Sequence, residues 1–237
     1  MKIIEPLIEV ENFNGIQIMK NIERACRTCY RSEDKITDTS YQNLLKNCIN
    51  RGHESVLEHE KISIRMTCDL GVYKDLTRHR IASFSIESTR YCNYGKDKFD
   101  NELKFIRPVY YVESWKDRNY EGSAMSLEEN KSAIWYRTME EIESNYIDMS
   151  KLGCTPDEMR MLLPHSIAAE VCMTANIREW KHILSLRTTN HVHPSIQQLM
   201  IPLLLKFKEE MPEIFNVIDY NTEFPKEKYA KILMMGV

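Results

Sequence analysis

The chain has 237 residues, of which 43% are hydrophobic and 28% are charged, and its formal net charge is −3. These values are typical of a globular protein with a full hydrophobic core, and the acidic balance argues against general nucleic-acid binding, which usually needs a net basic surface. The 7 cysteines are odd in number and scattered, which indicates reduced thiols rather than a disulfide framework. No apolar run is long enough to span a membrane, so we expect no signal peptide and a cytoplasmic location.

Helical and strand patterns alternate through the first third of the chain. Residues 3–10 predict a short strand interrupted by Pro6, and apolar positions recur at helical spacing over residues 16–30 and 41–49. The second helix has an N-cap candidate at residues 38–40 and ends at Gly52. Residues 60–68 alternate strictly between apolar and polar side chains, which predicts a half-buried strand. Asp69 is then placed to cap a short helix that ends just before Arg78.

Two clusters of polar or thiol side chains in this region would suit a metal. Cys26 and Cys29 have the spacing of a redox or zinc pair, but no second pair completes a tetrahedral site, so we interpret them as two buried helix cysteines. Residues 53–59 contain two histidines and two glutamates. Because a cationic stretch nearby competes for these carboxylates, we expect a hydrogen-bonding loop at a ligand site and no metal. A surface loop without a role is the alternative.

The remaining two thirds of the chain continue the mixture. We expect a strand within residues 103–109, the longest helix over residues 127–152, and a short helix that begins after Thr155 and ends before Pro164. An alternating strand over 167–175 leads into a helix over 177–187, another helix spans 196–207, and the tail beyond Pro212 adds at most one helix. The apolar seam of the longest helix faces either the body of the protein or a second subunit. Together these elements predict an α+β (mixed α/β) fold, with helices around a small, mostly antiparallel sheet in one domain over residues 1–237.

The stretch from Arg78 to Tyr91 concentrates the polar chemistry of the chain. It contains three arginines, a histidine, a glutamate and several hydroxyl side chains, and we find no hydrophobic period in it. Guanidinium groups form paired hydrogen bonds with phosphate and carboxylate oxygens and stay charged at any working pH. Arg78, Arg80 and Arg90 are therefore candidate ligands for an anion, and a solvated basic turn is the alternative interpretation.

Arg78-His79-Arg80, followed after seven residues by Ser88, resembles the signature of the flavin-dependent thymidylate synthases. The resemblance extends along the stretch to Ser83, Arg90 and Tyr91. It also extends to three other blocks that occur in the expected order: residues 53–59, residues 160–164, and residues 174–180 with 186–187. A lone Arg-His-Arg would be weak support, whereas four separated blocks with consistent spacing cover nearly the whole chain.

The resemblance implies an enzyme that makes dTMP from dUMP. Methylenetetrahydrofolate would supply the carbon, and NADPH would supply the reducing equivalents through FAD. It also implies an α/β homotetramer with active sites at subunit interfaces, with dUMP and the folate as partners and neither nucleic acid nor a membrane. No metal is implied.

The same resemblance assigns residues to roles. Arg187 and Ser88 would be catalytic, because Arg187 polarises the uracil ring while Ser88 orients the nucleotide. The residues expected to bind dUMP are Asp75, Arg78, Glu87, Ser88, Arg90, Arg160 and Arg187. Those expected on the FAD and folate side are His53, Ser55, Glu58, Arg78, His79, Arg80, Asn176, Arg178, His182 and His191. The chain departs from the family at Ile86, where Glu or Gln is usual, and at Asp75, where a longer side chain is common.

Two other functions compete for these residues. Flavin-free synthase chemistry needs a cysteine nucleophile, and Cys92 lies beside the motif, but no cysteine in the chain is followed by histidine as that chemistry requires. A non-catalytic or degenerate nucleotide- or RNA-binding protein would use the arginine-rich stretch. The sequence pI near 6.2 argues against that second alternative.

Overall fold

The computed structural model describes residues 1–11, 13–96, 98, 101–116 and 125–235. The chain divides into two compact units, each built from segments that are separate in the sequence. Unit 1 comprises Met1–Pro6, Thr67–Lys74 and Ile86–Glu170, and unit 2 comprises Leu7–Met66, Asp75–Ser85 and Val171–Val237. A single domain over residues 1–237 stays a prediction.

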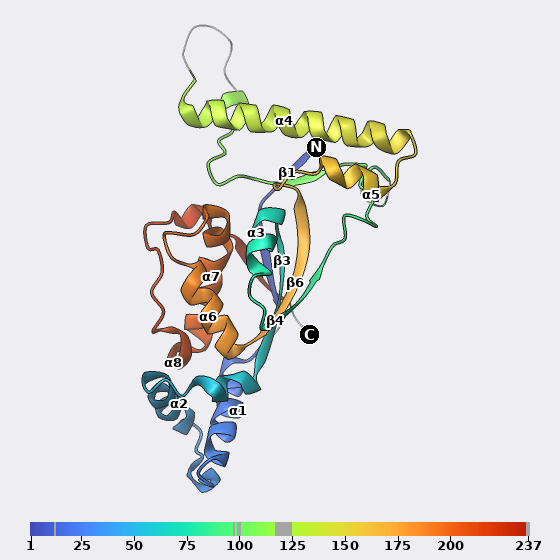
Figure 1. Cartoon of the computed structure of the whole chain (residues 1–237). Helices are drawn as coiled ribbons and strands as arrows, with labels where there is room; N and C mark the ends of the chain where they lie inside the picture. The colour runs from blue at the N-terminus through green and yellow to red at the C-terminus, as the bar shows by residue number, and fades with distance from the viewer. Residues whose placement is uncertain (12, 97, 99–100, 117–124, 236–237) are drawn as a thin grey trace. The chain divides into compact units, whose positions relative to one another are not determined.

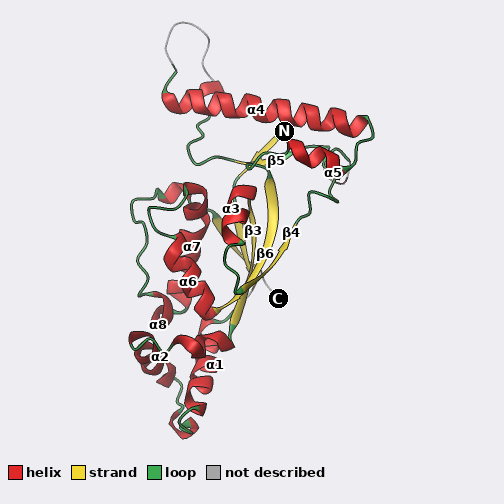
Figure 2. Cartoon of the chain, in the orientation of Figure 1, coloured by secondary structure: helices red, strands yellow, loops and turns green. Residues whose placement is uncertain are grey.

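The strands form two sheets. The smaller sheet pairs β1 (Lys2–Ile4) in parallel with β5 (Lys104–Ile106). The larger sheet has five strands in the order β4-β6-β3-β2-β7 and is mostly antiparallel, although the edge strand β7 pairs in parallel with its neighbour β2. Figure 2 shows β3, β4 and β6 of this sheet in yellow, among the red helices. The bounds of its strands are Leu7–Glu11 (β2), Lys61–Asp69 (β3), Ala82–Ile86 (β4), Ala168–Asn176 (β6) and Lys231–Met235 (β7). The predicted α+β class is confirmed.

Unit 2 holds most of the helices. Its core includes the rings of Trp180, Phe207 and Phe215, with Trp180 to Phe207 centroids 5.9 Å apart and Phe207 to Phe215 centroids 5.1 Å apart. The Trp180 indole donates a hydrogen bond to the Ile62 carbonyl at 3.0 Å, which attaches α6 to β3. Helices α6 and α7 lie side by side in Figure 1. The helical elements are α1 (Gly15–Thr28), η1 (Glu33–Lys35), α2 (Ser40–Asn50), η2 (Glu54–His59), α6 (Ile177–Arg187), α7 (Pro194–Glu210), α8 (Pro212–Phe215) and η6 (Lys226–Lys228), where η denotes a 3-10 helix.

Unit 1 is organised by its longest helix, α4 (Leu127–Lys151). Met139 and Tyr146 on α4 are buried in a cluster with Phe105 and Ile167, and Trp135, Ile142 and Met149 of the predicted seam pack against it. The seam therefore faces the body of unit 1. The other helical elements are η4 (Ser114–Lys116), α5 (Pro156–Met159) and η5 (Arg160–Leu162), and α3 (Leu70–Leu76) follows β3.

Several predicted elements needed correction. Pro6 lacks an N–H donor and separates β1 from β2, so the interrupted strand is two strands in different sheets. β4 lies inside the polar stretch 78–91, where apolar residues alternate with serines, so our conclusion that this stretch has no hydrophobic period was wrong. The loop expected at 53–59 is largely η2, and the tail adds β7 as well as a helix.

No helix within the described residues has both the length and the apolar character needed to cross a membrane.

Candidate functional site

A partly buried series of polar contacts joins the arginine-rich motif to the end of α6. Nε of Arg187 donates to Nε2 of His79 at 3.0 Å, and Nη2 of Arg187 donates to the Asp75 carbonyl at 2.9 Å. Because Nε2 of His79 accepts, its ring proton lies on Nδ1, which faces a Glu179 carboxylate oxygen at 3.4 Å. His79 is only 5% exposed. Residues from two sequence blocks are thus brought together, as the resemblance requires.

The electrostatics keep His79 neutral. Burial, followed by the nearby charge of Arg187 and by His182, lowers the pKa of His79 to about 4. Burial raises the pKa of Glu179. At neutral pH, His79 is therefore a neutral hydrogen-bond acceptor, and its contact with Glu179 is not an ion pair. The two bonds from Arg187 use two of its five N–H donors, which orients the guanidinium while donors remain for a ligand.

A cavity of about 490 Å³ in unit 2 adjoins these polar contacts, since Glu179 forms part of its wall. Four of the residues predicted for the flavin and folate side line it, and several residues without a predicted role line it as well. Its wall is formed by Glu54, Glu58, Ile81, Asn176, Arg178, Glu179, Lys181, His182 and Ser185.

Ion pairs hold the charged wall of this cavity. Arg178 pairs with Glu58, and Lys181 pairs with Glu54 at 2.7 Å, so these two cations of α6 are tied to η2. Asn176 is the N-cap of α6, and its side-chain oxygen accepts from the Glu179 N–H at 2.8 Å. One predicted ligand therefore already has a structural role, although its amide group still lines the cavity.

His79, Glu179 and His182 also have the composition of a metal site, and their ligand atoms lie within 4.8 Å of one another. However, Nε2 of His79 is already bound by the guanidinium cation of Arg187 at 3.0 Å. A second cation beside it would be repelled, so this cluster is better explained as the support of Arg187.

The other residues predicted for the flavin and folate side are more dispersed within unit 2. His53 and Ser55 line a separate cavity of about 360 Å³, which also contains Cys26 and Cys48. Arg78, Arg80 and His191 are exposed and line neither cavity. Asp75 contacts Arg187 through its backbone carbonyl, and binding of dUMP by its side chain stays a prediction.

Unit 1 contains the remaining predicted dUMP residues. Ser88 forms a tight turn, because its carbonyl accepts from the N–H groups of Tyr91 and Cys92 at 3.1 and 3.0 Å. Arg90 makes two bonds to the carboxylate of Asp157, at 3.1 and 3.2 Å. Arg160 lies 3.8 Å from the same carboxylate. Asp157, to which the motifs assigned no role, thus pairs with two of the arginines predicted to bind dUMP.

Glu87 lines a different cavity of unit 1, of about 570 Å³, together with Cys92 and Tyr94. Burial, followed by Glu87, raises the pKa of both the Cys92 thiol and the Tyr94 hydroxyl. A raised thiol pKa is the opposite of what a cysteine nucleophile needs. This environment argues against flavin-free chemistry at Cys92.

Sequence reasoning assigned no role to four of these residues: Glu54, Asp157, Glu179 and Lys181. Glu179 had a detectable signal, since it lies three residues before His182 on one helix face. The ion pairs made by the other three join segments far apart in the sequence or on different elements, which periodicity cannot reveal.

The fold matches that of a solved nucleotide-modifying enzyme. A UMP/dUMP methylase from Streptomyces cacaoi, solved with 5-Br dUMP, superposes with a TM-score of 0.71 at 20% identity. The match covers 91% of this chain and 96% of that one.

The family is established by sequence. The model of the family described as thymidylate synthase complementing protein matches residues 16–213. A relative from Halobacterium salinarum called flavin-dependent thymidylate synthase is 26% identical over 203 residues, which cover 82% of this chain and 81% of the relative. A relative of the same name from Thermosipho melanesiensis is 29% identical over 195 residues, which cover 81% of this chain and 82% of the relative. The chain belongs to this family, and the resemblance drawn from its motifs is confirmed.

The neutral state of His79 predicts how stability depends on pH. As pH falls from 6.5 towards 4, the unfolded chain binds a proton at this position and the folded protein does not, so stability falls across that window. His79→Gln keeps a hydrogen-bond acceptor but cannot titrate. Over this pH range its free energy of unfolding should therefore fall by roughly 2 kcal/mol less than that of the wild type. Urea denaturation at a series of pH values measures the difference.

His59→Gln, the same substitution at an exposed histidine, is the matched control. Parallel curves for the wild type and His79→Gln would contradict the neutral assignment.

Proposed function

We propose that this chain is a flavin-dependent thymidylate synthase that converts dUMP to dTMP, with methylenetetrahydrofolate as carbon donor and NADPH as reductant through FAD. The observation that carries the proposal is the buried support of Arg187 by His79 and the Asp75 carbonyl. An arginine meant to polarise a substrate must be held in one direction, and these two bonds provide that constraint.

The donors around the unit 2 cavity suit a flavin dinucleotide. Its volume of about 490 Å³ is within the range of small-molecule sites. Arg178 and Lys181 offer cations to a pyrophosphate, and Asn176 offers an amide. The hydride chemistry itself belongs to the flavin, while the protein binds and orients.

The proposed roles of the chain's own residues follow from their surroundings. Arg187 presents positive charge to the uracil ring. Because His79 is neutral, the imidazole that accepts from Arg187 does not repel the guanidinium. Ser88, held in its turn, orients the nucleotide. Arg90 and Arg160 bind the phosphate, and His53, Ser55, Glu58, His79 and His182 serve the flavin and folate side.

The family resemblance supports a homotetramer of single-domain subunits, and the scattered cysteines support a cytoplasmic location.

Purified protein tests the proposal directly. It should be yellow or become yellow with FAD, NADPH should bleach the flavin absorbance, and dTMP should form from dUMP and methylenetetrahydrofolate. A colourless protein that cannot be reconstituted with FAD and forms no dTMP would refute the proposal. RNA binding with a steep salt dependence in such a protein would favour the non-catalytic alternative.

The supported arginine provides the discriminating variant for this assay. Arg187→Ala should lower dTMP formation by at least ~100-fold, since it removes a charge aimed at the reacting ring. Arg65→Ala removes an exposed arginine of the same unit and should retain activity. Equal activities for the two variants would remove Arg187 from the proposed chemistry.

The carboxylate of Asp157 competes with phosphate for Arg90 and Arg160 in this proposal. Asp157→Asn should therefore tighten dUMP binding roughly two- to fivefold, a size expected for an exposed ion pair. Isothermal titration calorimetry with dUMP measures the change. Asp148→Asn, which breaks the exposed pair with Lys151 on α4, is the matched control. Unchanged or weaker binding in Asp157→Asn would contradict a phosphate role for the two arginines.

A further inference from the structure

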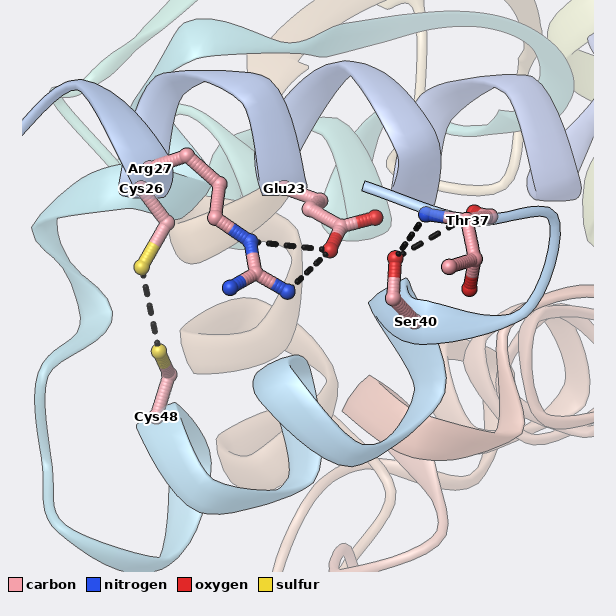
Figure 3. Close-up of polar contacts among 6 residues, drawn as sticks. All are labelled: Glu23, Cys26, Arg27, Thr37, Ser40 and Cys48. Atoms are coloured by element: carbon pink, nitrogen blue, oxygen red, sulfur yellow. Dashed lines mark hydrogen bonds and ion pairs between the residues drawn. The ribbon is translucent and has the colours of Figure 1, made fainter. Parts of the chain in front are cut away.

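Two cysteine side chains face each other across the helices α1 and α2. The sulfur atoms of Cys26 and Cys48 are 3.6 Å apart, and Figure 3 shows them pointing at each other from the two helices. The side chains are 8% and 7% exposed. Cys26 had been paired with Cys29 by sequence spacing, but Cys29 is exposed, so the expectation of two buried helix cysteines holds only for Cys26.

The connection between the two helices is held in place locally. Glu23 and Arg27 form a side-chain ion pair at 2.8 Å on the turns of α1 that adjoin Cys26, and the Glu23 side chain is fully buried. At the start of α2, Ser40 accepts from the Thr37 N–H at 2.8 Å and donates to the Thr37 carbonyl at 3.2 Å. These contacts order each helix locally, and the packing of α1 against α2 brings the two thiols together.

A small reagent has a route to the pair. Cys26 and Cys48 both line the cavity of about 360 Å³ that also contains Arg27, Arg51 and the exposed Cys29. Burial raises the pKa of Cys48 and outweighs the nearby charge of Arg51, which lowers it. A thiol in a solid core would lack the opening that the cavity provides.

We propose that Cys26 and Cys48 are a redox-modification site, which a small-molecule disulfide converts to a protein disulfide that joins α1 to α2. A disulfide needs a sulfur separation of roughly 2.0 Å, so the two atoms must approach by about 1.5 Å, within reach of side-chain rotation and a small helix adjustment. The inference is independent of the proposed catalytic activity.

The chemistry is ordinary thiol–disulfide exchange. The Cys26 thiolate attacks one sulfur of the reagent, breaks its S–S bond and releases one thiolate, leaving a mixed disulfide on Cys26. The Cys48 thiolate then attacks the Cys26 sulfur and releases the second thiol. The two cysteines lose two protons and two electrons in total, and the reagent is reduced to two thiols.

The crosslink would have a mechanical consequence. It closes a loop between positions 22 residues apart and fixes the end of α2. From there the chain passes through Gly52 into η2, whose Glu54 and Glu58 hold Lys181 and Arg178. Oxidation is thus expected to raise the thermal midpoint by several degrees.

The arrangement of cleavage sites makes the test direct. Trypsin cuts after Arg24, Arg27, Arg31, Lys46 and Arg51, which places Cys26, Cys29 and Cys48 on separate peptides, residues 25–27, 28–31 and 47–51. Full-length protein is incubated with excess 2-hydroxyethyl disulfide, the remaining thiols are alkylated under denaturing conditions, and the digest is analysed by mass spectrometry. Burial, followed by the hydrogen bond with Cys26, raises the pKa of Cys48 to about 11, so a mildly alkaline buffer is used.

We expect peptides 25–27 and 47–51 to be recovered as one disulfide-linked species, with a mass two hydrogens below the sum of the two peptides. In electrophoresis without reductant, the oxidised protein should run as a single chain. Cys29→Ser should give the same link, and Cys48→Ser should abolish it. The proposal is overturned if peptides 25–27 and 47–51 are recovered only in alkylated form, if peptide 28–31 is the main partner of either, or if the link joins two chains. Because mapping uses the unmutated protein, the result does not depend on whether a variant folds.

Discussion

The hydrogen bond from Arg187 to a neutral His79 is the interaction on which the account of the site depends. It requires two elements to end at the same place, the turn after α3 and the last turn of α6. α6 is started by its Asn176 cap and attached to β3 by the Trp180 indole. Burial keeps the imidazole uncharged, so it can accept from a guanidinium that it would otherwise repel. The orientation of Arg187 therefore follows from helix placement and desolvation together.

A second regularity is that several cations at the candidate sites, unlike Arg187, are paired with carboxylates. Arg178 pairs with Glu58 and Lys181 with Glu54 in unit 2, and Arg90 pairs with Asp157 in unit 1. Such pairs hold long side chains in place and contribute little stability where they are exposed. An anionic ligand can then replace the carboxylate. Under the proposed function, this arrangement would let a chain with a net charge of −3 present ordered arginines to phosphates.

Much of the fold could be predicted from periodicity. The strict alternation over 60–68 became β3, and the helix expected over 177–187 has those bounds. β4 was missed because its alternation covers only 5 residues within a stretch otherwise rich in charged side chains, and β7 because a tail strand is specified by its partner β2. In the site, the motifs identified Arg187 and His79 but not Glu179, whose role depends on a buried contact between elements. The exposure of Cys29 likewise depends on packing, since spacing alone made it equivalent to Cys26.

Nitrogen-15 NMR of histidine-labelled protein tests directly whether His79 is neutral and accepts from Arg187. With the His79 signals assigned by their loss in a His79 variant, we expect an unprotonated, hydrogen-bonded Nε2 and a protonated Nδ1 at neutral pH. We also expect a titration midpoint near 4. A ring protonated on Nε2, or a midpoint near the ordinary 6.5, would contradict the acceptor role of His79 and with it the support of Arg187.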